Sequence, residues 1–199
     1  MNNNPQNDKK VSVRADSGGH SFSFDTLPES LFDGTAQVEF SVSTHKTTLL
    51  PAVVFDERSA AKYLAVAGLA CREDERALCI TCGNIVAVVA VSVEFLARVA
   101  ETFGERASFT SPLLELCREE GSKMHIRRAG DVSYVVFCVN GKLRFAEAFR
   151  TESEEEVLYY VHLLRDRFDL NEYLIYISGE HSEATARLLS KYFSHVKCE

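Results

Sequence analysis

The pattern of apolar and polar positions is most regular between residues 123 and 149. Lys123 to Arg128 reads as one strand, Val132 to Val139 is nearly continuous in apolar residues, and Leu143 to Phe149 returns after a turn. The turn is Asn140-Gly141, a dipeptide that two-residue β-hairpins favour because both residues adopt positive φ readily. This segment therefore predicts a three-stranded meander with an apolar, central second strand.

Two helices and a short strand are predicted after the meander. A helix over Glu154 to Phe168 begins at the capping box Ser153-x-x-Glu156 and has an apolar stripe. Tyr173 to Ile177 is wholly apolar, which is typical of a strand buried on both faces, central in its sheet and parallel to Lys123–Arg128. A second amphipathic helix is predicted from Ser182 to Phe193.

The first half of the chain also predicts strands. Val11 to Val13 and Phe22 to Phe24 alternate around Asp16-Ser17-Gly18-Gly19, so we expect a β-hairpin there. Ala36 to Val42 alternates and predicts a third strand. These three strands would form a meander that resembles the one at residues 123–149.

The remaining elements are predicted from residues that cap helices and from glycines that end helices or form turns. Asp56 can cap a helix that runs to about Gly68, and the charged run Arg72 to Arg76 is read as a loop. Further predictions are a hairpin of Ala77–Cys82 and Ile85–Val91 around Gly83-Asn84, a helix over Val93–Phe103 between Ser92 and Gly104, a short strand near Phe109, and a helix over Pro112–Glu120.

Composition narrows the class of protein. The 199 residues are 46% apolar and 26% charged, as in ordinary folded proteins. The net charge of -7 argues against a nucleic-acid surface, because phosphate binding needs a basic stripe. Residues 1–10 are polar and predict a disordered tail without a secretory signal. The longest apolar run, Ile85 to Val93, is about half of what a membrane span requires, so we expect a cytoplasmic protein.

The order of the predicted elements resembles the actin-like ATPase fold, an α/β fold with mixed sheets and two ribonuclease H-like halves. We expect the halves at residues 11–120 and 121–199. Residues 135–145 and 176–180 resemble the pilus-assembly and cell-division branch of actin-like proteins. The chain is also similar to a bacterial family of proteins of unknown function, domain family 3822. The segments that carry this similarity are Thr48-Leu49-Leu50-Pro51, Phe55-Asp56-Glu57, Val86 to Val91, Leu158-Tyr159-Tyr160 and Lys191-Tyr192-Phe193.

This resemblance implies where a nucleotide would bind. Actin-like enzymes hold ATP between two hairpin loops, with a carboxylate near Mg²⁺ and backbone amides around the phosphates. Asp16, Ser17, Gly18 and Gly19 resemble the first loop, although Asp and Gly are also expected in any exposed turn. Such halves usually continue beyond the last helix, so we expect the C-terminal end to be trimmed or degenerate.

The other two sequence motifs that bind the nucleotide in actin-like enzymes are altered in this chain. Arg127-Arg128-Ala129-Gly130 stands where an Asp-x-Gly is expected, and an Arg cannot ligate Mg²⁺, although it can bind a phosphate. Ser178-Gly179-Glu180 keeps the first of two expected glycines and replaces the second. We therefore expect no ATP hydrolysis and assign no catalytic residue.

Cysteine and histidine spacing gives no metal site. Cys79 and Cys82 invite a zinc or redox reading, but residues three apart on a strand point to opposite faces, so we expect buried, reduced thiols. The six histidines lack paired spacing, and the acidic run Glu152 to Glu156 complements a helix dipole.

The sequence favours a non-catalytic actin-like protein that serves as a scaffold or partner-binding module, without a cofactor. Its partner would be another protein or a second copy of the chain. The alternative is an ATP-binding protein with little turnover, which would use Asp16, Ser17, Gly18, Gly19, Ser178 and Gly179. A thiol-dependent enzyme using Cys79 and Cys82 is a third possibility.

Overall fold

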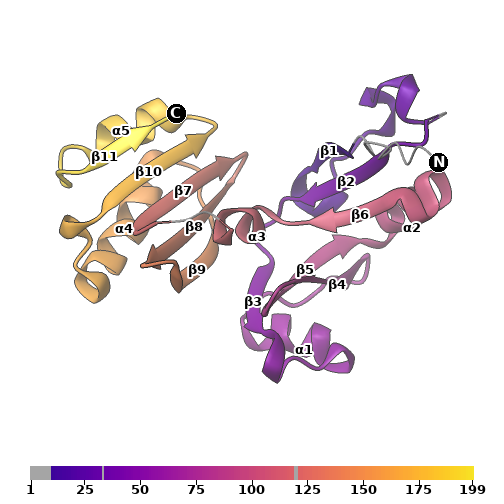
Figure 1. Cartoon of the computed structure of the whole chain (residues 1–199), viewed down its shortest axis with the longest axis horizontal. Helices are drawn as coiled ribbons and strands as arrows, with labels where there is room; N and C mark the ends of the chain where they lie inside the picture. Colours follow the sequence, from indigo (N-terminus) through magenta and orange to yellow (C-terminus); the bar gives the residue numbers. More distant parts are fainter. Residues whose placement is uncertain (1–9, 33, 119–120) are drawn as a thin grey trace, which may run out of the picture.

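The computed structural model describes residues 10–32, 34–118 and 121–199, which form three β-sheets and the helices that pack on them. Two lobes are visible in Figure 1: strands β1 to β6 build the first and strands β7 to β11 the second, with helix α3 between them. The predicted tail at residues 1–9 lies outside the described residues, and Lys10 already belongs to strand β1.

The sheet of the second lobe confirms the predicted meander. Strands β7 (Lys123–Ala129), β8 (Val132–Val139) and β9 (Lys142–Arg150) are antiparallel, and φ is 52° at Asn140 and 69° at Gly141 in their turn. Strand β10 (Leu174–Gly179) pairs in parallel with β7 and is an interior strand, as predicted.

A fifth strand, β11 (Val196–Cys198), completes this sheet in the order β11-β10-β7-β8-β9. The sequence did not predict this strand, which follows the last helix. The last helix, α5 (Ser182–Leu189), is shorter than predicted, since the chain turns after Leu189 to reach the edge of β10.

Helices cover both faces of the sheet. Helix α4 (Glu154–Phe168) and α5 pack on one face through Val157, Val161 and Leu189. The Ser153 hydroxyl accepts a hydrogen bond from the Glu156 amide as the capping box predicts, but the Glu156 carboxylate accepts from the Glu152 amide. Helix α3 (Pro112–Cys117) packs on the other face and is shorter than predicted, while residues 119 and 120 lie outside the described residues.

The predicted N-terminal hairpin is wrong. Strand β1 (Lys10–Ala15) pairs in parallel with β2 (Gln37–Val42), and β2 pairs in parallel with β6 (Ala107–Thr110). Phe22 and Phe24 form no strand; their rings pack edge to face, and Phe22 also packs against the rings of Phe40 and Phe95. Burial of two adjacent aromatic positions explains their alternation without any strand pairing.

The third sheet confirms the second hairpin. Strand β5 (Ile85–Ser92) lies between β3 (Thr47–Pro51) and β4 (Glu75–Cys82), and all pairings are antiparallel. Helix α2 (Val93–Phe103) forms as predicted, and α1 (Ala60–Val66) is shorter than the helix expected after Asp56. Short 3₁₀ turns complete the chain: Asp16–Gly19, Phe24–Thr26, Glu29–Leu31, Ala52–Val54, Glu57–Ser59, Gly104–Arg106 and Leu170–Glu172.

The two thiols of Cys79-x-x-Cys82 lie on opposite faces of β4, as predicted, but both are half-buried rather than buried as expected. Cys79 packs beneath α1 with Leu64 and Val88, whereas Cys82 packs in the core that contains Phe95. None of the six cysteines, all within the described part of the chain, is in a disulfide. In the described ranges, no helix is long and apolar enough to cross a membrane.

Burial predicts that the thiols react at very different rates. Burial raises the pKa of Cys117 to about 12, whereas Cys198 is exposed. Because the thiolate is the reactive form, we expect Cys198 to alkylate rapidly in the native protein and Cys117 to alkylate only after unfolding. Mass spectrometry of native and urea-treated samples measures both rates, and fast native labelling of Cys117 would contradict the packing of α3.

Candidate functional site

A cavity of about 370 Å³ lies in the cleft between the two lobes. Its walls come from the ends of β1 and β2, from α3, and from the ends of β7 and β10. The residues that line it include Ser12, Arg14, Ser41, Ser43, Glu115, Arg127, Arg128, Ser178 and Gly179. The fold thus brings Ser178 and Gly179 into the cleft together with the two predicted arginines.

The loop Asp16–Gly19 is packed against the first lobe. Ser17 and Gly18 adopt left-handed φ values of 51° and 64°, and the Gly18 amide donates to the Ser43 carbonyl at 2.9 Å. A Cβ on Gly18 would lie 2.7 Å from the Ala90 carbonyl oxygen, and one on Gly19 would lie 2.5 Å from the Phe95 ring. Both glycines are therefore required by tight packing on β5 and α2, and the Gly18 amide already has an acceptor.

Arg14 links the two sides of the cleft. Its Nε lies 2.6 Å from Asp16 Oδ1, and its Nη2 lies 2.6 Å from Oε1 of Glu180 in the other lobe. The second oxygen of Glu180 accepts from the Gly130 amide at 3.1 Å. Arg14 and the Gly130 amide together lower the pKa of Glu180. Arg14 was not among the predicted site residues, although its place near the end of a strand, two residues before Asp16, was a usable signal.

Gly179 is fixed by a close approach of two strands. Its φ is 84°, and an added Cβ would collide with the carbonyl oxygen of Arg128. That same carbonyl accepts a hydrogen bond from the Glu180 amide at 3.1 Å. Only glycine fits position 179, so the Ser178-Gly179-Glu180 turn is held directly on the end of β7.

The two predicted arginines have different surroundings. Arg127 Nη1 lies 2.5 Å from Glu115 Oε2, and Oε1 of Glu115 accepts from the Ser41 hydroxyl at 2.6 Å. Arg128 is only 3% exposed, and its Nη1 donates to Glu154 and Thr185 at the starts of α4 and α5. Of these two arginines, Arg127 therefore pairs with α3 at the wall of the cleft, whereas the Arg128 guanidinium binds the starts of two helices of the second lobe.

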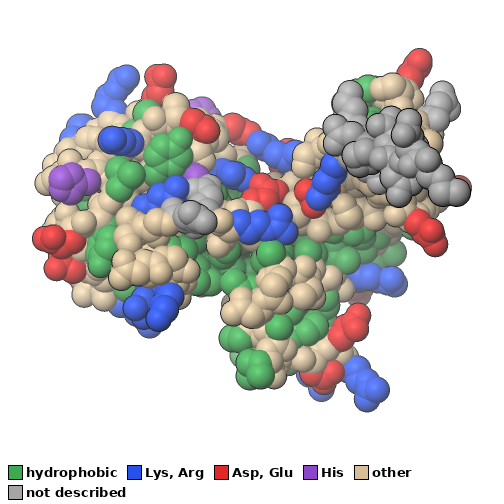
Figure 2. Space-filling view, in the orientation of Figure 1, with side chains coloured by type: hydrophobic (Ala, Val, Ile, Leu, Met, Phe, Trp, Pro, Cys, Tyr) green, Lys and Arg blue, Asp and Glu red, His purple; other side chains and the backbone are tan. Residues whose placement is uncertain are grey.

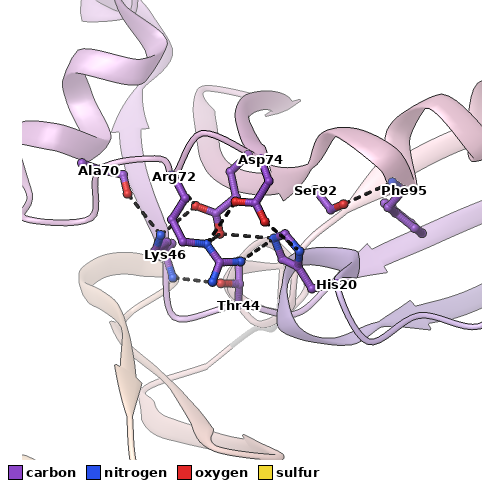
Figure 3. Close-up of polar contacts among 9 residues, drawn as sticks. His20, Thr44, Lys46, Ala70, Arg72, Asp74, Ser92 and Phe95 are labelled. Atoms are coloured by element: carbon purple, nitrogen blue, oxygen red, sulfur yellow. Dashed lines mark hydrogen bonds and ion pairs between the residues drawn. The ribbon is translucent and has the colours of Figure 1, made fainter.

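A smaller cavity of about 180 Å³ lies next to the Asp16–Gly19 loop and includes Ser17 in its lining. Its polar wall, drawn in Figure 3, is built around the carboxylate of Glu75, whose side chain is 5% exposed. Lys46 Nζ and the Arg72 amide each donate to that carboxylate at 2.7 Å. Burial raises the pKa of Glu75, but these donors outweigh burial and leave it below its ordinary value.

The sequence did not predict the charged cluster of Lys46, Arg72 and Glu75, because residues Arg72–Arg76 were interpreted as a loop. In the structure Arg72 also contacts His20, and Glu75 begins strand β4. Across the described ranges, no group of three or more His, Cys, Asp or Glu side chains is placed to hold a metal ion.

Comparisons with known proteins establish the family and the fold. A family model described as protein of unknown function (DUF3822) matches residues 28–196. A Bacteroides thetaiotaomicron protein with an actin-like ATPase fold and unknown function superposes with a TM-score of 0.73, at 19% identity over 86% of this chain and 72% of that one. The expected family resemblance and actin-like fold are thus confirmed.

Two solved structures show weaker likeness. The PilM–PilN type IV pilus biogenesis complex matches with a TM-score of 0.44 and 14% identity over 83% of this chain and 70% of that one. The cytoplasmic domain of EpsL from the Vibrio cholerae type II secretion system gives 0.43 and 14%, over 85% and 81%. No curated protein matches the chain.

The geometry predicts a small, pH-dependent role for Glu180. Since its pKa is lowered on folding, its contribution to stability is present above the ordinary Glu pKa of about 4.3 and is lost as pH falls through the lowered value. Both partners are 45% exposed, so Glu180→Gln should lower the free energy of unfolding at neutral pH by up to about 1 kcal/mol.

Urea unfolding of both proteins at neutral and acidic pH measures this difference. Glu101→Gln, on the exposed side of α2, is the matched control and should change little. If the deficit of Glu180→Gln persisted at acidic pH, the ion pair would not be its cause.

Proposed function

We propose that this chain, which belongs to the DUF3822 family, is a non-catalytic actin-like module that binds another protein or a second copy of itself. The observation that carries the proposal is the pairing inside the cleft. The groups that would receive a nucleotide are engaged with one another: Asp16 with Arg14, Arg14 with Glu180, and the Gly18 amide with Ser43.

Each of these pairings makes the binding of Mg-ATP less favourable for a physical reason. The Asp16 carboxylate already pairs through Oδ1 with Arg14 at 2.6 Å, so a metal-bound water would have to share this carboxylate with a guanidinium. Phosphate groups need backbone N–H donors, and the Gly18 amide already donates to a carbonyl. Arg127 cannot ligate Mg²⁺ and is neutralised by Glu115.

Exposed apolar side chains support a partner-binding role. Val53, Val54 and Val66, on and beside α1, are 91%, 62% and 90% exposed. Figure 2 shows hydrophobic side chains at the tip of the molecule where Figure 1 places α1. Contiguous apolar surface on a folded protein commonly marks an interaction site, and a net charge of -7 favours a protein over a nucleic acid.

One observation favours the alternative, an ATP-binding protein with little turnover. The cleft cavity of about 370 Å³ falls in the range of small-molecule sites, and Ser178 and Gly179 line it. In that case Asp16, Ser17, Gly18 and Gly19 would have to give up their present contacts.

Six cysteines without a disulfide agree with the cytoplasmic location that we propose for either function.

Thermal unfolding with nucleotides separates the two functions. A ligand at 100 times its Kd stabilises the native state by about 2.7 kcal/mol, which raises the Tm of a protein of this size by several degrees. We expect no shift with millimolar ATP, ADP or GTP, with or without Mg²⁺. Asp16→Ala is the diagnostic variant, and Asp25→Ala, which alters an exposed carboxylate, is its control.

A shift that requires Mg²⁺ and disappears in Asp16→Ala, but not in Asp25→Ala, would refute the non-catalytic proposal and support ATP binding. A shift without Mg²⁺ that is lost in Arg127→Ala would instead identify an anion site in the cleft and contradict both functions.

A further inference from the structure

Helix α4 presents large apolar side chains to solvent on the side that faces away from its sheet. The inner side of the helix buries Val157, Val161 and Leu164. On the outer side, Tyr159 and Leu163 are 59% and 54% exposed. Because side chains four residues apart are neighbours on a helix surface, these two groups form one apolar patch.

Helix α2 shows how an ordinary surface helix differs from α4. Beyond the first residue of α2, none of its exposed residues is a large apolar one. These exposed residues are Glu94, Ala97, Arg98, Ala100 and Glu101. The outer side of α4 instead has the composition of an interaction surface, in which tyrosine and other aromatic residues are enriched.

Neighbouring rings hold the patch on α4 in place. The Tyr159 ring lies 5.4 Å from the Tyr160 ring, which stacks on Phe149 of β9 at 4.1 Å. On the other flank of the helix, the ring of the exposed Tyr192 lies 5.3 Å from that of His162. Side chains that are already fixed lose less conformational entropy on binding, so this surface is prepared for a partner.

Opposite charges stand at the two ends of the patch. Glu155, Tyr159, Leu163 and Arg167 form one row with a spacing of four residues, and both charged members are exposed. Among the described residues neither of the two is in an ion pair, and the Arg167 guanidinium lies over the ring of Phe168. Such charges complement the helix dipole, and they also leave one end of the row acidic and the other basic.

This row is complementary to a second copy of itself that runs in the opposite direction. In a twofold-symmetric interface, a contact of residue i with residue j is repeated as j with i. Glu155 and Arg167 share a midpoint at Val161 with Tyr159 and Leu163, so one axis brings both pairs together. Rows of this spacing interdigitate when two helices cross at about −50°, the commonest packing class.

We propose that the chain forms a twofold-symmetric dimer through α4, in which Tyr159 packs against Leu163 of the partner subunit and Glu155 pairs with Arg167 of the partner subunit. The proposal rests on the partner-binding function proposed above and names the partner as a second copy. A single pair of helices buries less surface than a permanent dimer does, so we expect association that depends on concentration.

Sedimentation velocity of the full-length chain over a range of concentrations measures this association. We expect a monomer–dimer equilibrium whose Kd rises with salt, because ion pairs lie at both ends of the interface. Leu163→Asp changes an exposed side chain and should raise the Kd at least tenfold. Val66→Asp, at an exposed valine of α1, is the matched control and should dimerise as the wild type does.

Charge exchange tests the antiparallel register. Glu155→Arg and Arg167→Glu should each raise the Kd at least tenfold, because each variant places like charges opposite one another. An equal mixture of the two variants should dimerise, since every charge at these positions then faces its opposite. Glu101→Arg, on the exposed side of α2, makes the same charge change as Glu155→Arg and should have no effect.

A chain that stays monomeric at its highest soluble concentration would overturn the proposal, and so would a dimer that Leu163→Asp leaves intact. A mixture of the charge variants that stays monomeric would overturn the antiparallel register. Each of these results would leave the binding of another protein standing. A nucleotide-dependent rise in Tm would refute the proposed function, and sedimentation would still measure dimerisation through α4 independently.

Discussion

The guanidinium of Arg14 is the charge on which the cleft depends. It lies between two carboxylates, Asp16 on its own lobe and Glu180 on the other, at 2.6 Å from each. A cation in this position satisfies both acids and joins the end of β1 to the turn after β10. Removing it would leave the two carboxylates without their shared cation and would remove one link between the lobes.

Each departure from the nucleotide-binding pattern has its own partner in the structure. Glu180 replaces an expected glycine and binds Arg14, while Arg127 stands where an Asp is expected and binds Glu115. The glycine that is kept, Gly179, is required because the Arg128 carbonyl leaves no room for a Cβ. The polar groups named here therefore all have partners within the chain.

Local pattern was sufficient where sequence neighbours pair with each other. The meander of β7 to β9 and helix α4 were predicted from alternation, the Asn140-Gly141 turn and the Ser153 cap. Strand β10 pairs with the distant β7, and it was predicted from its wholly apolar sequence instead. Local pattern failed for β1, whose parallel partner β2 begins more than twenty residues later. It also failed for β11, a three-residue strand that is defined by its pairing with β10. Arg127 was correctly placed in the cleft, but the roles of Arg14 and Glu75 depend on partners that sequence spacing does not reveal.

The ion pairs of Arg14 restrain the separation of the two lobes, and the distance between the lobes reports this restraint. Spin labels introduced through non-canonical amino acids at Lys62 on α1 and Glu183 on α5, both exposed, report the distance by pulsed electron spin resonance. We expect one narrow distance distribution in the wild type, unchanged by Mg-ATP and broadened in Arg14→Ala. A broad wild-type distribution that Mg-ATP narrows or shortens would contradict this expectation.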